Sequence, residues 1–235
     1  MVNVAISIAG SEASGGAGAQ TDIKTFHELG TFGAVALTCI VSFDPKNDWA
    51  HRFVPVDAQV IKDQIEAITA VPPEAATVKI GMLGTVPTME AVAEKLAEAQ
   101  FANVVVDPVL ICKGQEPGAA LDTDNALKEK ILPLATVVTP NVFEASQLSG
   151  IEVTDLETLK AAAKKIQELG VPNVVAKGGA VLDGEDAVDV LYDGENFTEY
   201  RARKIGERYI SGAGCTLAAA ITAELTKGAD IHDAV

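Results

Sequence analysis

The stretch "SGAGCTLAAAITAELTKG" (residues 211–228) places two glycines and a cysteine directly before a run with helical spacing. Gly212 and Gly214, with Ala213 between them, allow successive backbone N–H groups to turn inward and form an anion-binding loop at the positive end of a helix. Such a place lowers the pKa of a thiol, so Cys215 is expected to be partly thiolate near neutral pH. It could then accept a proton from an alcohol while the loop stabilises a phosphoryl group in transfer. The alternative is a glycine-rich helix start with a small residue packed in its first turn.

A second glycine-rich loop, "GSEASGGAGAQTD" (residues 10–22), follows the first strand-like run. It matches neither the P-loop nor the dinucleotide-binding pattern, because Gly15 is followed by Gly16 and Ala17 and no Lys-Ser/Thr pair is present. One interpretation is a tight turn from strand to helix. The other is close approach of the backbone to a flat ligand, with Asp22 one helical turn inside.

The loop "VDPVLICKG" (residues 106–114) combines a carboxylate with a thiol. Asp107 ends an apolar strand, where a carboxylate must be solvated, paired or bound to a metal. Cys112, beside Lys113 and a glycine, is a better candidate for a reactive thiol than Cys39, which lies within "ALTCIV" and is expected in the core. Inert core filler remains the alternative for Cys112.

Two further loops carry groups suited to phosphate and magnesium. In "VVTPNVFEAS" (residues 137–146), Asn141 and Glu144 fit a helix capping box, and Glu144 could also hold Mg²⁺ through water while Thr139 or Asn141 faces phosphate. In "VVAKGG" (residues 174–179), Lys177 precedes two glycines and suits a point charge on phosphate. An ordinary surface lysine is the alternative.

The elements that must position these loops alternate in type along the chain. Apolar runs such as "VNVAISIA", "AVALTCIV" and "NVVVDPV" are interleaved with segments of helical periodicity, which indicates an α/β fold with a parallel sheet covered on both faces. Two Asp-Gly pairs in "VLDGEDAVDVLYDGENFTEY" predict hairpins and an antiparallel edge. We expect one domain over residues 1–235, and the end at "KGADIHDAV" suggests that further helices follow in the native protein.

Composition limits the partners. The 235 residues are 48% hydrophobic and carry a formal net charge of -15, which disfavours nucleic acid and anionic membrane surfaces and favours a small-molecule partner. The start, "MVNVAISIAG", has neither a basic segment nor a long apolar stretch, so a cytoplasmic location is expected. Three cysteines at unrelated spacings suit reduced thiols better than disulfides or a zinc site.

Taken in order, these motifs resemble the ribokinase-like superfamily, in the branch of hydroxymethylpyrimidine kinases and their pyridoxal-kinase relatives. The resemblance runs through "AGSEASGGAGAQTDIKTF", "KIGMLGT", "VDPV", "TPNVFEA", "KGG" and "GAGCT" and covers essentially the whole chain. It implies a ribokinase-like three-layer α/β/α fold with a central, mostly parallel sheet and an active site along the carboxyl edge of the strands. It also implies ATP and Mg²⁺ as cofactors and suggests a homodimer.

The resemblance also assigns roles. Cys215 would be the catalytic base and residues 212–214 the anion hole. The ATP phosphates would be contacted by Thr139, Asn141, Lys177 and Gly179, the hydrated Mg²⁺ by Glu144, and adenine by Val188. The substrate ring would lie near Gly10, Asp22, Met82 and Asp107.

One departure bears on the substrate. Pyrimidine-specific members have a glutamine at the end of the second strand, in a Val-Ala-Gln-Asn stretch, whereas "VSFD" places Phe43 there. A phenyl ring can stack on a pyridine but cannot hydrogen-bond an aminopyrimidine. "VDPVLICKG" resembles pyridoxal kinases in which a second cysteine, here Cys112, adds to the aldehyde as a hemithioacetal, and His51 is a candidate polar contact to the ring.

Three functions follow from this reading. The first is a pyridoxal/pyridoxine kinase that phosphorylates the 5′-hydroxymethyl group. The second is a hydroxymethylpyrimidine or phosphomethylpyrimidine kinase, with dual activity as a variant. The third, from another class, is a non-catalytic vitamin-binding sensor in which Cys112 and Cys215 form a redox pair, which requires their sulfurs to lie within disulfide reach.

Overall fold

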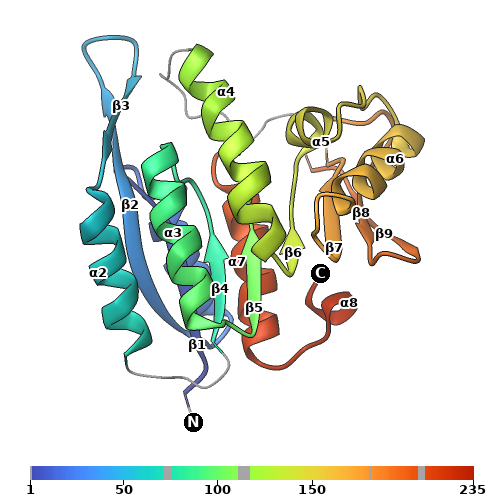
Figure 1. The fold of residues 1–235 in the computed structure, drawn as a ribbon. Coiled ribbons are helices and arrows are strands. Elements are labelled where there is room, and N and C mark those ends of the chain that lie inside the picture. Colours follow the sequence, from blue (N-terminus) through green and yellow to red (C-terminus); the bar gives the residue numbers. More distant parts are fainter. Residues whose placement is uncertain (1, 71–75, 111–116, 180, 206–209) are drawn as a thin grey trace.

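The computed structural model describes residues 2–70, 76–110, 117–179, 181–205 and 210–235. Within these ranges one sheet of nine strands runs through the molecule in the order β3-β2-β1-β4-β5-β6-β7-β8-β9. The six strands from β2 to β7 in this order are parallel, and antiparallel strands flank them on both sides (Figure 1). This confirms the predicted α/β fold with a mostly parallel sheet.

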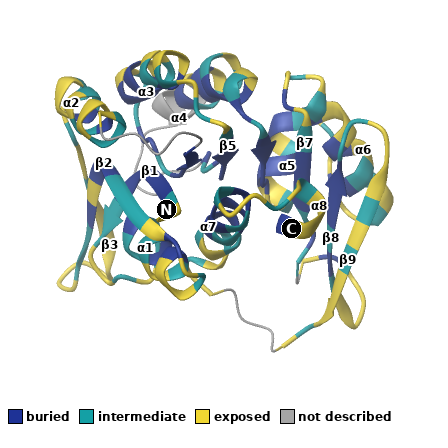
Figure 2. Ribbon diagram, turned by 90° about the horizontal axis from the view of Figure 1, so that it is seen from below, coloured by how far each residue is buried: buried dark blue, intermediate teal, exposed yellow. Residues whose placement is uncertain are grey.

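The strands are shortest in the centre of the sheet, and the longest are β2 and its neighbour β1. Their bounds are β1 Val4–Glu12, β2 Phe32–Asp44, β3 Ala50–Pro55, β4 Thr77–Ile80, β5 Asn103–Val106, β6 Val137–Val138, β7 Asn173–Lys177, β8 Asp186–Tyr192 and β9 Phe197–Arg203. The central strands are buried on both faces because they are continuous apolar runs, whereas β3 and β9 are largely exposed (Figure 2).

Helices cover both faces of the sheet and complete the expected three layers. Their bounds are α1 Gly18–Glu28, α2 Ala58–Thr69, α3 Val86–Ala99, α4 Pro117–Ala126, η1 Leu127–Ile131, η2 Leu132–Leu134, α5 Val142–Ser149, α6 Leu156–Gln167, α7 Ala213–Thr226 and α8 Ile231–Ala234. One apolar core joins the sheet to α2, α3, η1, α5 and α6. Smaller cores on the opposite face join it to α7 with α8 and to α1.

Local chemistry fixes where several helices begin. The side chains of Asp57, Thr85 and Asp155 each accept a backbone N–H in the first turn of α2, α3 and α6. Such caps satisfy donors that have no partner inside the helix. They hold the helix starts near the carboxyl ends of the strands, where the loops of interest lie.

The antiparallel pairing is more extensive than the sequence predicts. The expected hairpin is present as β8 and β9, joined through residues 193–196. The structure adds β3, which pairs antiparallel with the end of β2. In the turn between them, Asp48 and Trp49 have positive φ angles of 48° and 58°. The sequence did not predict this turn, because positive φ is uncommon for residues other than glycine. No helix in the described residues is long and apolar enough to cross a membrane.

The strand order changes direction at β1, which lies between β2 and β4. The connection through α1 leads to β2 on one side, and later strands continue on the other. In open α/β sheets, ligands bind beyond the carboxyl ends of the strands at such a switch point. The ends of β1 and β4 are therefore where a substrate cavity is expected.

Candidate active site

A cavity of ≈ 620 Å³ opens at this switch point. Its lining residues are Ala9, Gly10, Glu12, Ser14, Ala17, Gly18, Val41, Phe43, Trp49, His51, Phe53, Lys79, Gly81, Met82, Val109, Ser211 and Cys215. The structure thus brings together five of the residues predicted from sequence, Gly10, Phe43, His51, Met82 and Cys215. They come from β1, the β2–β3 hairpin, the loop after β4 and the start of α7.

Aromatic side chains form one wall of the cavity. Phe43 on β2 lies directly opposite His51 on β3, and their rings meet edge to face with centroids 4.9 Å apart. Trp49 and Phe53 from the same hairpin also line the space. Such a wall suits a flat heteroaromatic ligand.

Close backbone packing forms the floor. A Cβ added to Gly10 would lie 2.5 Å from Sγ of Cys39 and 3.1 Å from Cε of Met82, so only glycine leaves these neighbours in place. Cys39 is fully buried, which confirms its predicted core position, and burial raises the pKa of its thiol to about 11. Cys39 is therefore a packing residue.

The loop that precedes α1 is ordered by one carboxylate. Glu12 accepts hydrogen bonds from the backbone N–H of Ser14 at 2.8 Å, from the Ser14 hydroxyl at 2.6 Å and from the N–H of Ala17 at 3.2 Å. Burial by itself would raise the pKa of Glu12, but these hydrogen bonds lower it below its ordinary value. The carboxylate therefore stays ionised and fixes the shape of the loop.

The start of α7 packs directly against that loop. Gly212 caps the helix with φ of 82°, in the left-handed region that favours glycine. A Cβ at Gly212 would overlap the carbonyl oxygen of Gly16, so the two glycine-rich loops touch backbone to backbone. The predicted anion-binding loop thus lies beside the cavity, with Cys215 on its rim.

The charge state of Cys215 differs from the expectation. Burial raises the pKa of the Cys215 thiol above its ordinary value, and the carboxylates Asp107 and Asp22 raise it further. The Lys79 ammonium and the Gly18 backbone N–H act in the opposite direction. The prediction of a lowered pKa was wrong because it counted the helix end and not the desolvation and the neighbouring carboxylates.

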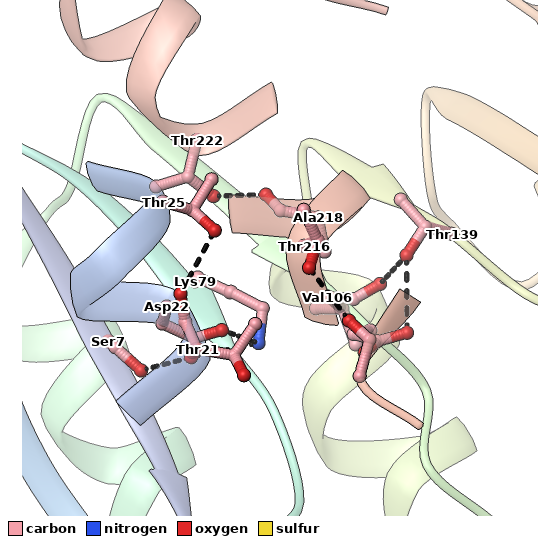
Figure 3. Close-up of polar contacts among 12 residues, drawn as sticks. Ser7, Thr21, Asp22, Thr25, Lys79, Val106, Thr139, Thr216, Ala218 and Thr222 are labelled. Carbon is pink, nitrogen blue, oxygen red and sulfur yellow. Dashed lines mark hydrogen bonds and ion pairs between the residues drawn. The ribbon is translucent and has the colours of Figure 1, made fainter. Parts of the chain in front are cut away.

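Asp22 does not border the cavity. It is fully buried behind Lys79, whose Nζ lies 2.9 Å from both carboxylate oxygens, and it accepts a 2.6 Å hydrogen bond from Ser7 (Figure 3). Lys79 also has no exposed side-chain surface. The sequence placed Asp22 near a substrate ring, whereas the structure places it in a buried ion pair beneath the cavity.

A second group of polar side chains lies on the other side of the α7 start. We call it the Lys177 cluster, and its members are Asp107, Thr139, Glu144 and Lys177. Nζ of Lys177 is 3.2 Å from Oδ1 of Asp107, which Thr139 also approaches at 3.5 Å (Figure 3 shows Thr139). A Cβ at Gly214 would lie 3.1 Å from Nζ of Lys177. The cluster therefore adjoins the predicted anion hole, but Asp107 does not line the cavity.

Glu144 caps the start of α5 and also contributes a negative charge to this cluster. It accepts from the Asn141 N–H at 2.8 Å and its own N–H donates to the Asn141 side chain at 2.9 Å, which confirms the predicted capping box. Burial and the nearby charge of Asp107 raise the pKa of Glu144 to about 7, although the Lys177 ammonium acts to lower it. Two buried carboxylates facing one ammonium leave an excess of negative charge.

That donor set fits a hydrated Mg²⁺. Magnesium in phosphate-transfer sites is held by one or two carboxylates together with waters and phosphates. A carboxylate whose charged form is disfavoured by a like neighbour gains most from a nearby cation. Among the described residues no group of three or more His, Cys, Asp or Glu side chains could hold a metal alone, so phosphate oxygens would complete the coordination.

The predicted adenine side lies at the β7–β8 edge. Val188 is 7% exposed, and its carbonyl accepts the N–H of Gly178 at 3.1 Å. Gly179, with φ of 49°, donates its N–H to Asp189 at 3.0 Å. Both predicted residues therefore adjoin the end of β7, where Lys177 lies.

Cys112 falls outside the described residues, so the predicted aldehyde clamp and the redox pair with Cys215 are not placed. Several cavity residues escaped the sequence reasoning, namely Glu12, Trp49, Phe53, Lys79, Gly81, Val109 and Ser211. A lysine inside the four-residue apolar strand "TVKI" was the one usable signal for Lys79, because a buried charge requires a partner. The β2–β3 hairpin, which carries Trp49 and Phe53, was missed because its turn lacks a typical turn sequence.

Residues 12–235 match the family model described as phosphomethylpyrimidine kinase. The chain belongs to this family. It is 48% identical over 233 residues to a pyridoxine kinase of Bacillus subtilis (strain 168), covering 98% of this chain and 85% of that protein. A hydroxymethylpyrimidine/phosphomethylpyrimidine kinase of the same strain is 39% identical over 234 residues, covering 98% of this chain and 84% of that protein.

Solved structures show the same fold in pyridoxal kinases, which are ribokinase-like. A Bacillus subtilis pyridoxal kinase in complex with ADP superposes with a TM-score of 0.93 at 47% identity, covering 100% of this chain and 88% of that chain. A Staphylococcus aureus pyridoxal kinase in complex with AMP-PCP and pyridoxal gives a TM-score of 0.90 at 41% identity, covering 100% and 84%. The family is thus established by both sequence and fold.

Replacing Gly212 tests the contact between the two glycine-rich loops. Gly212→Ala should lower kcat/KM by about 100-fold, because the α7 start must move away from Gly16. Gly228→Ala is the matched control, since Gly228 also has positive φ at 93° but has no atom within 4 Å of an added Cβ. It should cost about 1 kcal/mol of stability and leave turnover intact. Equal turnover in both variants would contradict the assigned role of the contact.

Glu144 should lower the stability of the ligand-free protein at neutral pH and above. Its pKa is raised from 4.5 to about 7, so between these values the native state holds a proton that the unfolded state has lost, and stability falls as pH rises. Glu144→Gln should therefore raise Tm at pH 8 by roughly 5 °C and converge with the wild type near pH 5. Glu157→Gln, an exposed control, should leave the thermal melting curves unchanged at both pH values. A lower Tm for Glu144→Gln at pH 8 would refute this.

Proposed function

We propose that the chain is a pyridoxal kinase that transfers the γ-phosphoryl group of ATP to the 5′-hydroxymethyl group of pyridoxal or pyridoxine. The observation that carries the proposal is Phe43 in the wall of the cavity that also holds Cys215. Its ring and His51 offer an aromatic edge to a pyridine and no amide for an aminopyrimidine. The similarity to kinases of pyridoxine and pyridoxal supports the same substrate class.

The proposed chemistry uses groups on both sides of the α7 start. Cys215, as thiolate, accepts the proton of the substrate hydroxyl as its oxygen bonds to the γ-phosphorus and the bond to the ADP oxygen breaks. The backbone N–H groups of residues 212–214 stabilise the phosphoryl oxygens. The thiol keeps the proton until solvent removes it.

The nucleotide would lie over the Lys177 cluster. Thr139, Asn141, Lys177 and Gly179 would contact its phosphates, Val188 would border adenine, and Glu144 would hold hydrated Mg²⁺. When bound, the ion supplies positive charge that neutralises the phosphate oxygens. The net charge of -15 makes this local set of cationic and N–H groups necessary for an anionic substrate.

Two further features are part of the proposal. Cys112 would form the hemithioacetal with the pyridoxal aldehyde, a role that rests on the sequence resemblance alone. A homodimer is supported by the outer face of the β2–β3 hairpin, where the paired residues Ile40 and Val54 are 43% and 60% exposed. This apolar face points away from the aromatic wall.

A second candidate is hydroxymethylpyrimidine or phosphomethylpyrimidine kinase activity. The family model and the relative of that description favour it, and both substrates present a hydroxymethyl group on a flat ring. The two candidates share Cys215 and the Lys177 cluster and differ only in what the cavity wall recognises.

Comparing the two substrates tests the function. We expect MgATP-dependent formation of the 5′-phosphate, identified by mass spectrometry, with a higher kcat/KM for pyridoxal and pyridoxine than for hydroxymethylpyrimidine. Cys215→Ala should lower kcat at least ~100-fold, the usual contribution of a general base, while Thr226→Ala at the far end of α7 should not. A preference for hydroxymethylpyrimidine would favour the second candidate, and no phosphorylation of either would refute both.

Phe43 should set the preference between the rings. Phe43→Gln restores an amide to the cavity wall and should lower kcat/KM for pyridoxal by about tenfold while raising that for hydroxymethylpyrimidine relative to it. Ser42→Gln is the matched control, because the neighbouring side chain points to the other face of β2 and does not line the cavity. Identical substrate ratios in all three proteins would show that Phe43 does not discriminate.

A further inference from the structure

The buried Lys79–Asp22 pair is a costly feature that substrate binding does not explain. Both side chains have no exposed surface, although Lys79 borders the cavity from behind its wall. Taking two charges out of water costs several kcal/mol per ion unless pairing and hydrogen bonds repay it. Asp22 is held on its other side by the Ser7 hydroxyl at 2.6 Å, which leaves the pair rigid (Figure 3).

The ammonium group of this pair lies directly behind the cavity wall. A Cβ added to Gly81, which lines the cavity, would lie 3.2 Å from Nζ of Lys79, so the missing side chain at Gly81 exposes the wall to the field of the ammonium. Cys215 borders the same cavity. Asp22 lies farther back, because it is not among the lining residues.

We propose that the buried Lys79–Asp22 pair is a positioning element for Cys215, in which the fixed ammonium of Lys79 stabilises the thiolate that must accept the hydroxyl proton. Lys79 keeps its own proton throughout, and the proton of the alcohol passes to the sulfur. The inference rests on the proposed function of Cys215 as base and adds a residue whose side chain is fully buried.

The charges around the sulfur support this assignment. Cys215 is faced by Lys79 of β4, Asp22 of α1 and Asp107 after β5, together with the backbone N–H of Gly18. Lys79 is the only cationic side chain in this set of described neighbours. Burial alone would lower the pKa of Lys79, but Asp22 and then Cys215 and Asp107 raise it above its ordinary value, so the ammonium persists at neutral pH. Asp22 thus holds Lys79 in place, while Cys215 and Asp107 share in keeping it charged.

The test measures the thiol itself. The rate of Cys215 alkylation by iodoacetamide, followed by mass spectrometry of its peptide over a range of pH, reports the apparent pKa without requiring turnover. Lys79→Met should raise this pKa by about one unit, which lowers alkylation about tenfold at a fixed pH below it. Asp22→Asn should shift the pKa downward, because it removes a negative charge and leaves the ammonium.

The opposite signs separate an electrostatic role from a merely structural one. Loss of packing would shift the pKa of the Cys215 thiol in the same direction in both variants. That result, or an unchanged pKa in Lys79→Met, would overturn the proposal. Lys62→Met, which removes a partly buried lysine paired with Glu94 far from the cavity lining, is the control and should leave the thiol pKa unchanged. If Lys79→Met does not fold, the double variant Lys79→Met/Asp22→Asn removes both buried charges, and its thiol pKa should still exceed that of the wild type.

Turnover measurements then distinguish failure of the Lys79 proposal from failure of the proposed kinase function. With pyridoxal as substrate, the rise of kcat/KM with pH should move upward in Lys79→Met in parallel with alkylation. Opposite alkylation shifts without any kinase activity would keep the electrostatic pair and reject the proposed function. Full activity with unshifted profiles would keep the function and reject the role of Lys79.

Discussion

The contact between the carbonyl of Gly16 and Cα of Gly212 is the constraint on which the site depends. It brings the amino ends of α1 and α7 together at the switch point of the sheet. Positive ends of two helices meeting at one place favour anionic groups there, and neither backbone could come so close with a side chain between them. Because of this contact, Cys215 has the Gly18 N–H as a neighbour as well as its own helix start.

Around this contact the charges are arranged as two lysine–carboxylate pairs of unequal exposure. Lys177 and Asp107 keep 12% and 6% of their side-chain surface, whereas Lys79 and Asp22 keep none. The first pair is therefore partly accessible from outside, whereas the second is closed off from solvent. In the proposed function, a chain of net charge -15 would bind phosphate through this local placement, with Lys177 available for contact and Lys79 acting through its charge.

The sequence predicted the parts of this arrangement that depend on local pattern. Alternation of apolar runs and amphipathic segments predicted the parallel sheet, and Asn141 with Glu144 predicted the capping box. Glycine spacing predicted the α7 start. These features follow from backbone geometry within a few residues, so a single segment carries enough information to define them.

Two misplaced features, the location of Asp22 and the direction of the Cys215 pKa shift, depend on distant segments. Asp22 was expected near the substrate ring from the family resemblance, but Lys79, 57 residues away, pairs with it within the core. Burial and the distant carboxylates Asp107 and Asp22 reversed the expected pKa shift of Cys215, although Lys79 acts against them. They outweigh a helix end whose influence falls off within one turn. A buried charge in a four-residue strand cannot be interpreted until its partner is known. The pKa of the thiol is therefore a property of the assembled sheet edge rather than of the "GAGCT" motif, and the motif alone locates the proposed base but not the charges that set its pKa.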